Sequence, residues 1–176
     1  MPFTKKDLPI NVDAIKGFLA DDEGEALFAA ASESITLGPC LEVGSYCGKS
    51  TVYLGAACQQ KNGSVYAIDH HRGSEEHQLG EEYHDSDLFD TQAQLMDTFK
   101  EFRRVMREAK LEDTVIPIVA ASTLASTNWS TPLRMVFIDG GHSLDAAMAD
   151  YRAWAAHVSV GGILAIHDIF PNPTQG

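Results

Sequence analysis

Two histidines in the last third of the chain stand where acid–base chemistry is plausible. His142 follows Asp139 by three residues, and His167 directly precedes Asp168. An imidazole exchanges a proton near neutral pH, and a neighbouring carboxylate can orient the ring or share a divalent ion with it. We therefore regard His142 and His167 as candidate catalytic residues. The alternative is that both rings only orient loops through hydrogen bonds.

A second candidate site is a glycine-bounded segment, in which residues 42–50 read EVGSYCGKS. Glycines allow a sharp turn and let a ligand approach the backbone, and a helix beginning near Lys49 would add free N–H groups. The spacing G-x-x-x-G differs from the G-x-G-x-x-G of dinucleotide-binding loops. Only three residues separate Gly44 from Gly48-Lys49, whereas a phosphate-binding P-loop requires four.

Asp69 stands at the end of an apolar run, 25 residues beyond Gly44. In nucleotide-binding α/β folds, an acid roughly 20 residues past the glycine loop accepts hydrogen bonds from ribose hydroxyls. We expect this role for Asp69. The alternative is an acid that caps the following turn.

Short apolar runs alternate with segments of helical period. Continuous apolar runs predict parallel strands buried on both faces, and the alternation predicts βαβ units whose ligands bind beyond the carboxyl ends of the strands. The expected strands are 40–44, 64–69, 115–120, 135–139 and 162–168. The expected helices are 11–20, 25–36 (after a turn at 21–24), 49–60, 95–109 and 144–158.

Composition narrows the class of protein. The 176 residues fit one domain, with N-terminal helices in 1–36 and an α/β core in 37–170. A formal net charge of −12 disfavours nucleic acid as a partner. No apolar run approaches the ~20 residues of a membrane span, and the N-terminus does not resemble a signal peptide. We expect a cytoplasmic protein with no nucleic-acid or membrane partner.

Three cysteines occur without a C-x-x-C pair, namely Cys40, Cys47 and Cys58. This pattern predicts reduced thiols. Cys40 is expected in a buried strand. Cys47, in the glycine-bounded segment, is either a small packing residue or a reactive thiol.

Several segments, in this order along the chain, resemble catechol O-methyltransferase and its relatives. They are 41–50 (LEVGSYCGKS), 119–122 (VAAS) and 135–139 (MVFID). The stretch 139–168 is similar to a bacterial branch, methyltransferase family 24, and the resemblance covers about 39–170. It implies a class I S-adenosylmethionine-dependent methyltransferase with a three-layer Rossmann-like sheet. The five strands, numbered along the chain, would lie in the order 3-2-1-4-5.

The resemblance also implies roles for individual residues. The methionine end of S-adenosyl-L-methionine would lie over the glycine segment, Asp69 would hold the ribose with His70 beside the adenine, and Ser122 would lie at the adenine edge. The implied cofactor-binding residues are Glu42, Gly44, Ser45, Tyr46, Gly48, Ser50, Asp69, His70, Ser122 and Asp139. The implied metal ligands are Asp139 and Asp168, with His167 beside them.

The expected reaction is methyl transfer to a hydroxyl oxygen of a small molecule, with or without a divalent ion. The ion would be Mg²⁺ or, because imidazole favours softer metals, a transition metal. The catechol enzyme has a lysine base after its metal-binding aspartate. Here Gly140-Gly141-His142 follows Asp139, which makes His142 the candidate base. Two alternatives are an NAD-type oxidoreductase and a non-catalytic cofactor-binding protein.

Residues 70–90 contain four histidines and seven carboxylates. Three interpretations are a lid over the site, a metal site using some of His71, His77 and His84, and a solvated acidic loop. At the other end, the sequence stops soon after the fifth expected strand. The antiparallel hairpin of class I methyltransferases is therefore expected to be missing, which would leave an open sheet edge and favour a homodimer.

Overall fold

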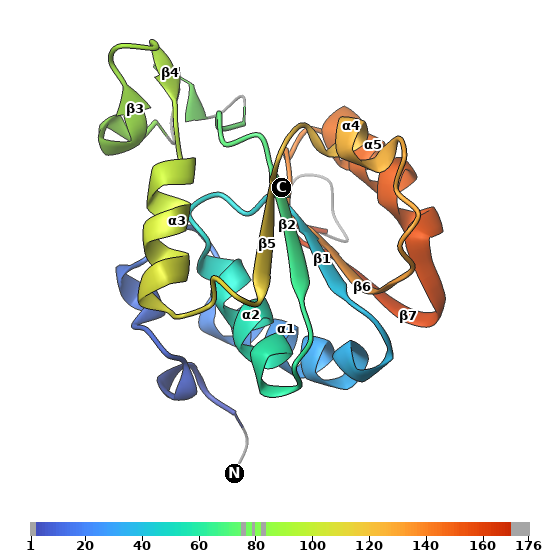
Figure 1. Ribbon diagram of the computed structural model, residues 1–176. Helices are drawn as coiled ribbons and strands as arrows, with labels where there is room; N and C mark the ends of the chain where they lie inside the picture. Colours follow the sequence, from blue (N-terminus) through green and yellow to red (C-terminus); the bar gives the residue numbers. More distant parts are fainter. Residues whose placement is uncertain (1–2, 75–76, 79, 82–83, 170–176) are drawn as a thin grey trace.

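A parallel sheet forms the centre of the protein in the computed structural model, which describes residues 3–169 except 75, 76, 79, 82 and 83. Its strands are β1 (Cys40–Val43), β2 (Val65–Asp69), β5 (Val115–Val119), β6 (Leu133–Ile138) and β7 (Val158–Ile166). They lie in the order β5-β2-β1-β6-β7, and every pair is parallel (Figure 1). Counted along the chain, this is the predicted order 3-2-1-4-5, so the fold prediction is confirmed.

Helices cover both faces of the sheet because successive strand residues point to opposite sides. Leu41 and Val43 pack with Trp154 on one face, whereas Cys40 packs with Tyr53 on the other. The first face carries α4 (Ser122–Ser126) and α5 (Leu144–Trp154), and the other carries α1 (Asp21–Ser34), α2 (Lys49–Gln60) and α3 (Phe99–Glu108) (Figure 1). A separate hairpin, β3 (Phe89–Asp90) with β4 (Leu95–Met96), extends beyond α3.

The N-terminal helices differ from the prediction. Within 11–20 the chain forms only a 3₁₀ turn at Val12–Ala14, and α1 begins at Asp21, so the helix predicted at 11–20 and the turn predicted at 21–24 are wrong. Acidic residues at 21–23 form the first helical turn, where they interact favourably with the helix dipole. The Glu23 carboxylate also accepts a hydrogen bond from the Ala20 amide, which helps to fix this start.

Two other helices are shorter than predicted. Leu95 belongs to β4, and α3 begins only at Phe99. The Phe99 amide donates a hydrogen bond to the Asp97 side chain. Ser143 caps α5 as expected, but α5 ends at Trp154 and β7 already begins at Val158. The apolar residues that recur at helical spacing in 144–158 begin with Leu144 and would form the buried face, but Leu144 is 77% exposed, whereas Asp150 and Trp154 are buried.

The two outer strands are less buried than the sequence predicted, since it indicated strands covered on both faces. The central strands β1 and β6 are almost entirely buried, whereas β5 and β7 contain exposed residues, with Val160 fully exposed. Pro117 lies in the edge strand β5, where a missing amide is tolerated. Homodimer formation stays a prediction. The prediction that the antiparallel hairpin is missing also stays untested, because it concerns the region after residue 169, where the described residues end. No described helix combines the length and apolar character needed to cross a membrane.

Candidate functional site

The sheet register brings three candidate residues, Gly44, Asp139 and His167, to the carboxyl ends of the strands. Main-chain bonds run from the Gly44 amide to the Ile68 carbonyl (2.9 Å), from Asp139 to Val43 (2.8 Å) and from His167 to Ile138 (2.9 Å). The chain segments that leave β1, β2, β6 and β7 are therefore held side by side. As expected for a parallel α/β sheet, the candidate site lies beyond the carboxyl ends of the strands.

The glycine loop between β1 and α2 has an unusual backbone. Gly44, Tyr46 and Gly48 have φ angles of +87°, +44° and +93°, and the Gly48 amide bonds the Ser45 carbonyl at 2.7 Å. The loop is closed on itself and leads directly into the N-terminus of α2, whose first amides have no partner within the helix. The Ser45 hydroxyl is buried and has no hydrogen-bond partner among the residues that the structure describes. A polar ligand group could satisfy this atom.

Asp69 is clamped by the backbone on both sides. Its Oδ2 accepts a hydrogen bond from the Tyr46 amide at 2.8 Å, and its Oδ1 accepts one from the His71 amide at 2.6 Å. An ionised carboxylate can accept about four hydrogen bonds, so acceptor positions remain for a ligand. The geometry is compatible with the expected ribose contact, and that role stays a prediction.

Glu42 lies beneath the loop and is completely buried. Its carboxylate accepts hydrogen bonds from Ser50 Oγ (2.6 Å) and Thr51 Oγ1 (2.5 Å), both in the first turn of α2. Glu42 and Ser50, both expected at the cofactor, therefore satisfy each other and fix α2 to β1. Burial, reinforced by the charges of Asp139 and Asp69, raises the pKa of Glu42 to about 8.

Replacing Glu42 with glutamine is expected to change how stability depends on pH. The pKa is about 8 in the folded protein and near 4.5 ordinarily, so only the folded state keeps the proton between these values. In the wild type, the contribution of Glu42 to the free energy of unfolding is complete below pH 4.5. It is lost as pH rises towards 8, by up to about 1.4 kcal/mol per pH unit. Glu42→Gln lacks this dependence. Urea unfolding of both proteins from pH 5 to 8 measures the difference, and parallel curves would contradict it.

The expected adenine edge is built around an acid that sequence reasoning missed. Ser122 Oγ donates a hydrogen bond to Asp150 Oδ1, and Trp154 Nε1 lies 3.4 Å from the same hydroxyl. Burial raises the pKa of Asp150. A Cβ added to Gly140 would lie 2.4 Å from Asp150 Oδ2, so the loop after β6 passes directly over this carboxylate. The i, i+4 spacing of Asp150 and Trp154 is the only sequence signal of their shared face.

His70 lies beside this edge on the surface. Its Nδ1 accepts a hydrogen bond from the Arg72 amide at 3.0 Å, and the ring is near enough to Asp150 for an electrostatic interaction. The structure thus brings His70, Ser122 and Asp150 to one end of the strand edge. The contact of His70 with adenine stays a prediction.

His167 stands among three carboxylates at the other end of the site. Nδ1 lies 3.2 Å from Asp139 Oδ1 and 3.2 Å from Asp168 Oδ2, and Nε2 lies 3.2 Å from Glu23 Oε2 on α1. Asp139 above all, together with Glu23 and Asp168, raises the pKa of His167 to about 10. The ring is therefore protonated at neutral pH. His142 is more exposed, and its Nδ1 lies 3.6 Å from Asp168 Oδ2.

The donor arrangement does not fit the metal that the resemblance implies. Among the described residues, no group of three or more His, Cys, Asp or Glu side chains is placed to hold a metal ion. At this end of the site, Asp139 Oδ1 and Asp168 Oδ2 each lie 3.2 Å from the same ring nitrogen, Nδ1 of His167. The chemistry proposed below therefore contains no step through a metal.

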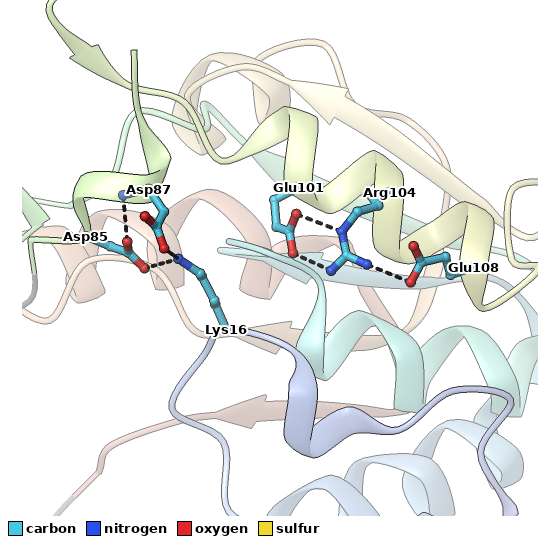
Figure 2. Close-up of polar contacts among 6 residues, drawn as sticks. All are labelled: Lys16, Asp85, Asp87, Glu101, Arg104 and Glu108. Atoms are coloured by element: carbon cyan, nitrogen blue, oxygen red, sulfur yellow. Dashed lines mark hydrogen bonds and ion pairs between the residues drawn. The ribbon is translucent and has the colours of Figure 1, made fainter. Parts of the chain in front are cut away.

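The segment 70–90 packs against the N-terminal part of the chain. Figure 2 shows Lys16 reaching Asp85 (2.6 Å) and Asp87 (3.0 Å). The His77 ring centroid lies 5.0 Å from that of Tyr46 and 6.3 Å from that of Phe18. A hollow of about 460 Å³ remains between these parts and the glycine loop. It is lined by Lys16, Gly17, Phe18, Tyr46, His84, Asp85 and Ser86.

These contacts bear on the three interpretations of 70–90. His71 is buried, and His84 Nδ1 interacts with the His77 carbonyl at 3.1 Å, so neither side chain is arranged with the others as a ligand set in the described part of the segment. A segment tied to the N-terminus beside the glycine loop favours the lid, which stays a prediction. Residues 75, 76, 79, 82 and 83 lie outside the description.

The cysteines are all free and buried. Burial raises the pKa of Cys47 to about 12. Because the thiolate is the nucleophilic form, this favours the packing role for Cys47 over a reactive thiol.

A five-stranded parallel sheet in this order, with a glycine loop and a clamped acid at neighbouring strand ends, defines a Rossmann-like domain of the class I methyltransferase type. The chain belongs to methyltransferase family 24, described as a methyltransferase domain, whose family model matches residues 41–169. The resemblance stated from the sequence is thereby confirmed.

Solved structures with a similar fold include three methyltransferases. The first is PaMTH1 of Podospora anserina bound to S-adenosylhomocysteine, with 12% identity, a TM-score of 0.62 and coverage of 85% of this chain and 53% of that one. The second is an O-methyltransferase of Bacillus cereus in complex with S-adenosylhomocysteine (16%, 0.57, 85% and 56%). The third is TomG of Streptomyces achromogenes, an O-methyltransferase of tomaymycin synthesis bound to S-adenosylmethionine (14%, 0.59, 88% and 63%). The chain thus spans between 53% and 63% of their lengths, and likenesses at this identity establish the fold alone.

Proposed function

We propose that this domain binds S-adenosylmethionine and transfers its methyl group to a hydroxyl oxygen of a small molecule. The observation that carries the proposal is the clamp of Asp69 beside the left-handed glycine loop. The Asp69 carboxylate offers hydrogen-bond acceptors, and the glycine loop at the neighbouring strand end allows a ligand to lie close to the backbone. A nucleoside ligand requires both features. The similar structures of B. cereus and S. achromogenes are O-methyltransferases and support oxygen as the acceptor atom.

Methyl transfer from a sulfonium is an in-line displacement. The acceptor oxygen forms a bond to the methyl carbon, the bond from carbon to sulfur breaks, and the sulfur leaves as the neutral thioether of S-adenosylhomocysteine. The protein must align these three atoms and remove the hydroxyl proton. It contributes most by holding the donor over the glycine loop with its methyl group facing the acceptor.

We assign removal of the proton to His142. Of the two candidate histidines, His167 lies 3.2 Å from both Asp139 and Asp168, and these carboxylates favour its protonated form over the neutral form that a base requires. Its fixed positive charge instead stabilises the negative charge that develops on the acceptor oxygen. His142 lies at the same strand edge with half of its side chain exposed, and it can pass the proton to water.

The acceptor has space beside these groups. A hollow of about 430 Å³ lies between α1 and β7, with apolar walls that include Leu27, Phe137 and Ile166 and with His167 and Asp168 at one end. Volumes of this size suit small organic ligands. An acceptor with an apolar body and a hydroxyl head fits this combination.

The proposal is tested with the purified chain and S-adenosylmethionine labelled in its methyl group. A panel of phenols, sugars and aliphatic alcohols is offered beside amines and thiols, and labelled products are identified by mass spectrometry. The expected result is label in an ether-type methyl group together with an equal amount of S-adenosylhomocysteine. Label found only on nitrogen or sulfur acceptors would contradict the assignment of oxygen.

A further inference from the structure

Two buried side chains stand directly behind Asp69 and have no part in the chemistry described above. His71 and Thr98 are 2% and 1% exposed. His71 Nδ1 lies 2.7 Å from Thr98 Oγ1, and the Thr98 amide donates to the His71 carbonyl at 3.2 Å. The ring and the main chain of His71 are therefore both tied to the N-cap residue of α3.

The Thr98 hydroxyl does not serve its own helix. Thr98 is the N-cap residue of α3, and threonine in this position ordinarily bonds an amide of the first turn. Here its side chain makes no such bond, and Asp97 accepts from the Phe99 amide instead. The hydroxyl is directed to the imidazole, so the pair is more than a by-product of helix capping.

The backbone of His71 explains why it needs this support. Its φ is +57°, a left-handed conformation that is uncommon for a residue with a side chain. In this conformation its amide donates the 2.6 Å hydrogen bond to Asp69 Oδ1. The ring packs on Phe99 and Phe102 of α3, at centroid distances of 4.9 and 5.3 Å, which holds the turn in place.

The same helix supports the other side of the Asp69 clamp. A Cβ added to Gly48 would lie 3.3 Å from the Phe102 ring and 2.8 Å from Met106, so α3 packs directly on the glycine loop. The Tyr46 amide of that loop is the second donor to Asp69. Both donors are thus held by α3, one through the loop and one through His71.

We propose that His71 and Thr98 are positioning residues that fix the Asp69 carboxylate for the ribose hydroxyls of the cofactor, an inference that rests on the proposed function. The pair locks the His71 amide, the amide orients Oδ1, and the Tyr46 amide orients Oδ2. With both oxygens held, the free acceptor positions of the carboxylate face a diol as a fixed pair. If the His71 turn relaxes, the carboxylate rotates and its contacts with the two hydroxyls are lost.

Three variants test this proposal. Thr98→Val removes the hydroxyl at nearly constant shape, and Thr98→Ser is the control that keeps it. His71→Asn removes the ring but retains a residue that tolerates left-handed φ. Calorimetry measures binding of S-adenosylhomocysteine and of its 2′,3′-dideoxy analogue to each protein, and thermal melting confirms that each is folded.

The expected result is a loss of discrimination between the two ligands. Thr98→Val and His71→Asn are expected to bind S-adenosylhomocysteine about tenfold more weakly, a change of about 1.4 kcal/mol, while their affinity for the dideoxy analogue stays within twofold of wild type. Thr98→Ser should resemble wild type with both ligands.

Equal weakening of both ligands would show a general structural role and overturn the proposal, as would unchanged affinities. Wild-type protein that binds both ligands equally would overturn it while leaving the cofactor in place. Wild-type protein that binds neither ligand would overturn the proposed function itself, and this inference with it.

Discussion

Alanine at position 44 is expected to destabilise the protein by about 3 kcal/mol or more. Gly44 has a φ of +87°, and a Cβ there would lie 2.0 Å from the main-chain oxygen of Asp139. Because that oxygen belongs to the backbone leaving β6, it cannot rotate away as a flexible side chain would. The collision pushes apart the ends of β1 and β6, so binding of S-adenosylhomocysteine should be lost with the stability. Urea unfolding measures the first effect, and calorimetry the second.

Gly80→Ala is the matched control for this substitution. Gly80 also has a positive φ, +96°, but a Cβ there would meet no atom of the described residues within 4 Å. It therefore carries only the cost of the left-handed backbone, about 1–2 kcal/mol. If both variants lose the same stability, the close approach of β1 and β6 is not what requires glycine at position 44.

Replacing His142 with glutamine is expected to lower kcat about 10²- to 10⁴-fold, the usual contribution of a general base. Affinity for S-adenosylhomocysteine should stay within about twofold, because His142 is assigned to the acceptor and not to the cofactor. Steady-state kinetics with an acceptor identified by the labelling experiment provides kcat, and calorimetry provides the affinity.

His157→Gln is the control for this substitution. His157 directly precedes β7 and therefore lies at the amino end of that strand, away from the carboxyl ends where the site lies. The control substitution should leave kcat unchanged. A large loss of kcat in His167→Gln, with none in His142→Gln, would show that the proton goes to the other histidine and that the ion pairs around His167 do not persist during turnover.

The strands could be predicted because their signals are local, whereas their order was implied by the resemblance to class I methyltransferases. Apolar runs bounded by turn residues locate β1, β2 and β6 closely, and the residues that follow them, such as Gly44 and Asp69, are placed at one edge by the parallel topology alone. The start of α1 was misread because three successive acids resemble a turn, although acids are equally typical of a first helical turn.

Long-range pairs carry no such local signal. Glu23 lies 144 residues from His167, and their contact exists only because α1 packs beside β7. That contact, with those of Asp139 and Asp168, favours the protonated form of His167 and so distinguishes its surroundings from those of His142. Thr98 was likewise invisible as part of the site, because the helix predicted at 95–109 placed it inside the helix, whereas it is the N-cap residue of α3.

The central claim is that the end of β2 and the glycine loop hold S-adenosylmethionine. Calorimetric titration of the purified chain with S-adenosylhomocysteine, with NAD as the competing ligand and Asp69→Ala as the variant, tests it most directly. We predict micromolar binding of S-adenosylhomocysteine, no binding of NAD, and a loss of at least about tenfold in the variant. Binding of NAD in preference, or binding of S-adenosylhomocysteine that Asp69→Ala leaves intact, would contradict the account.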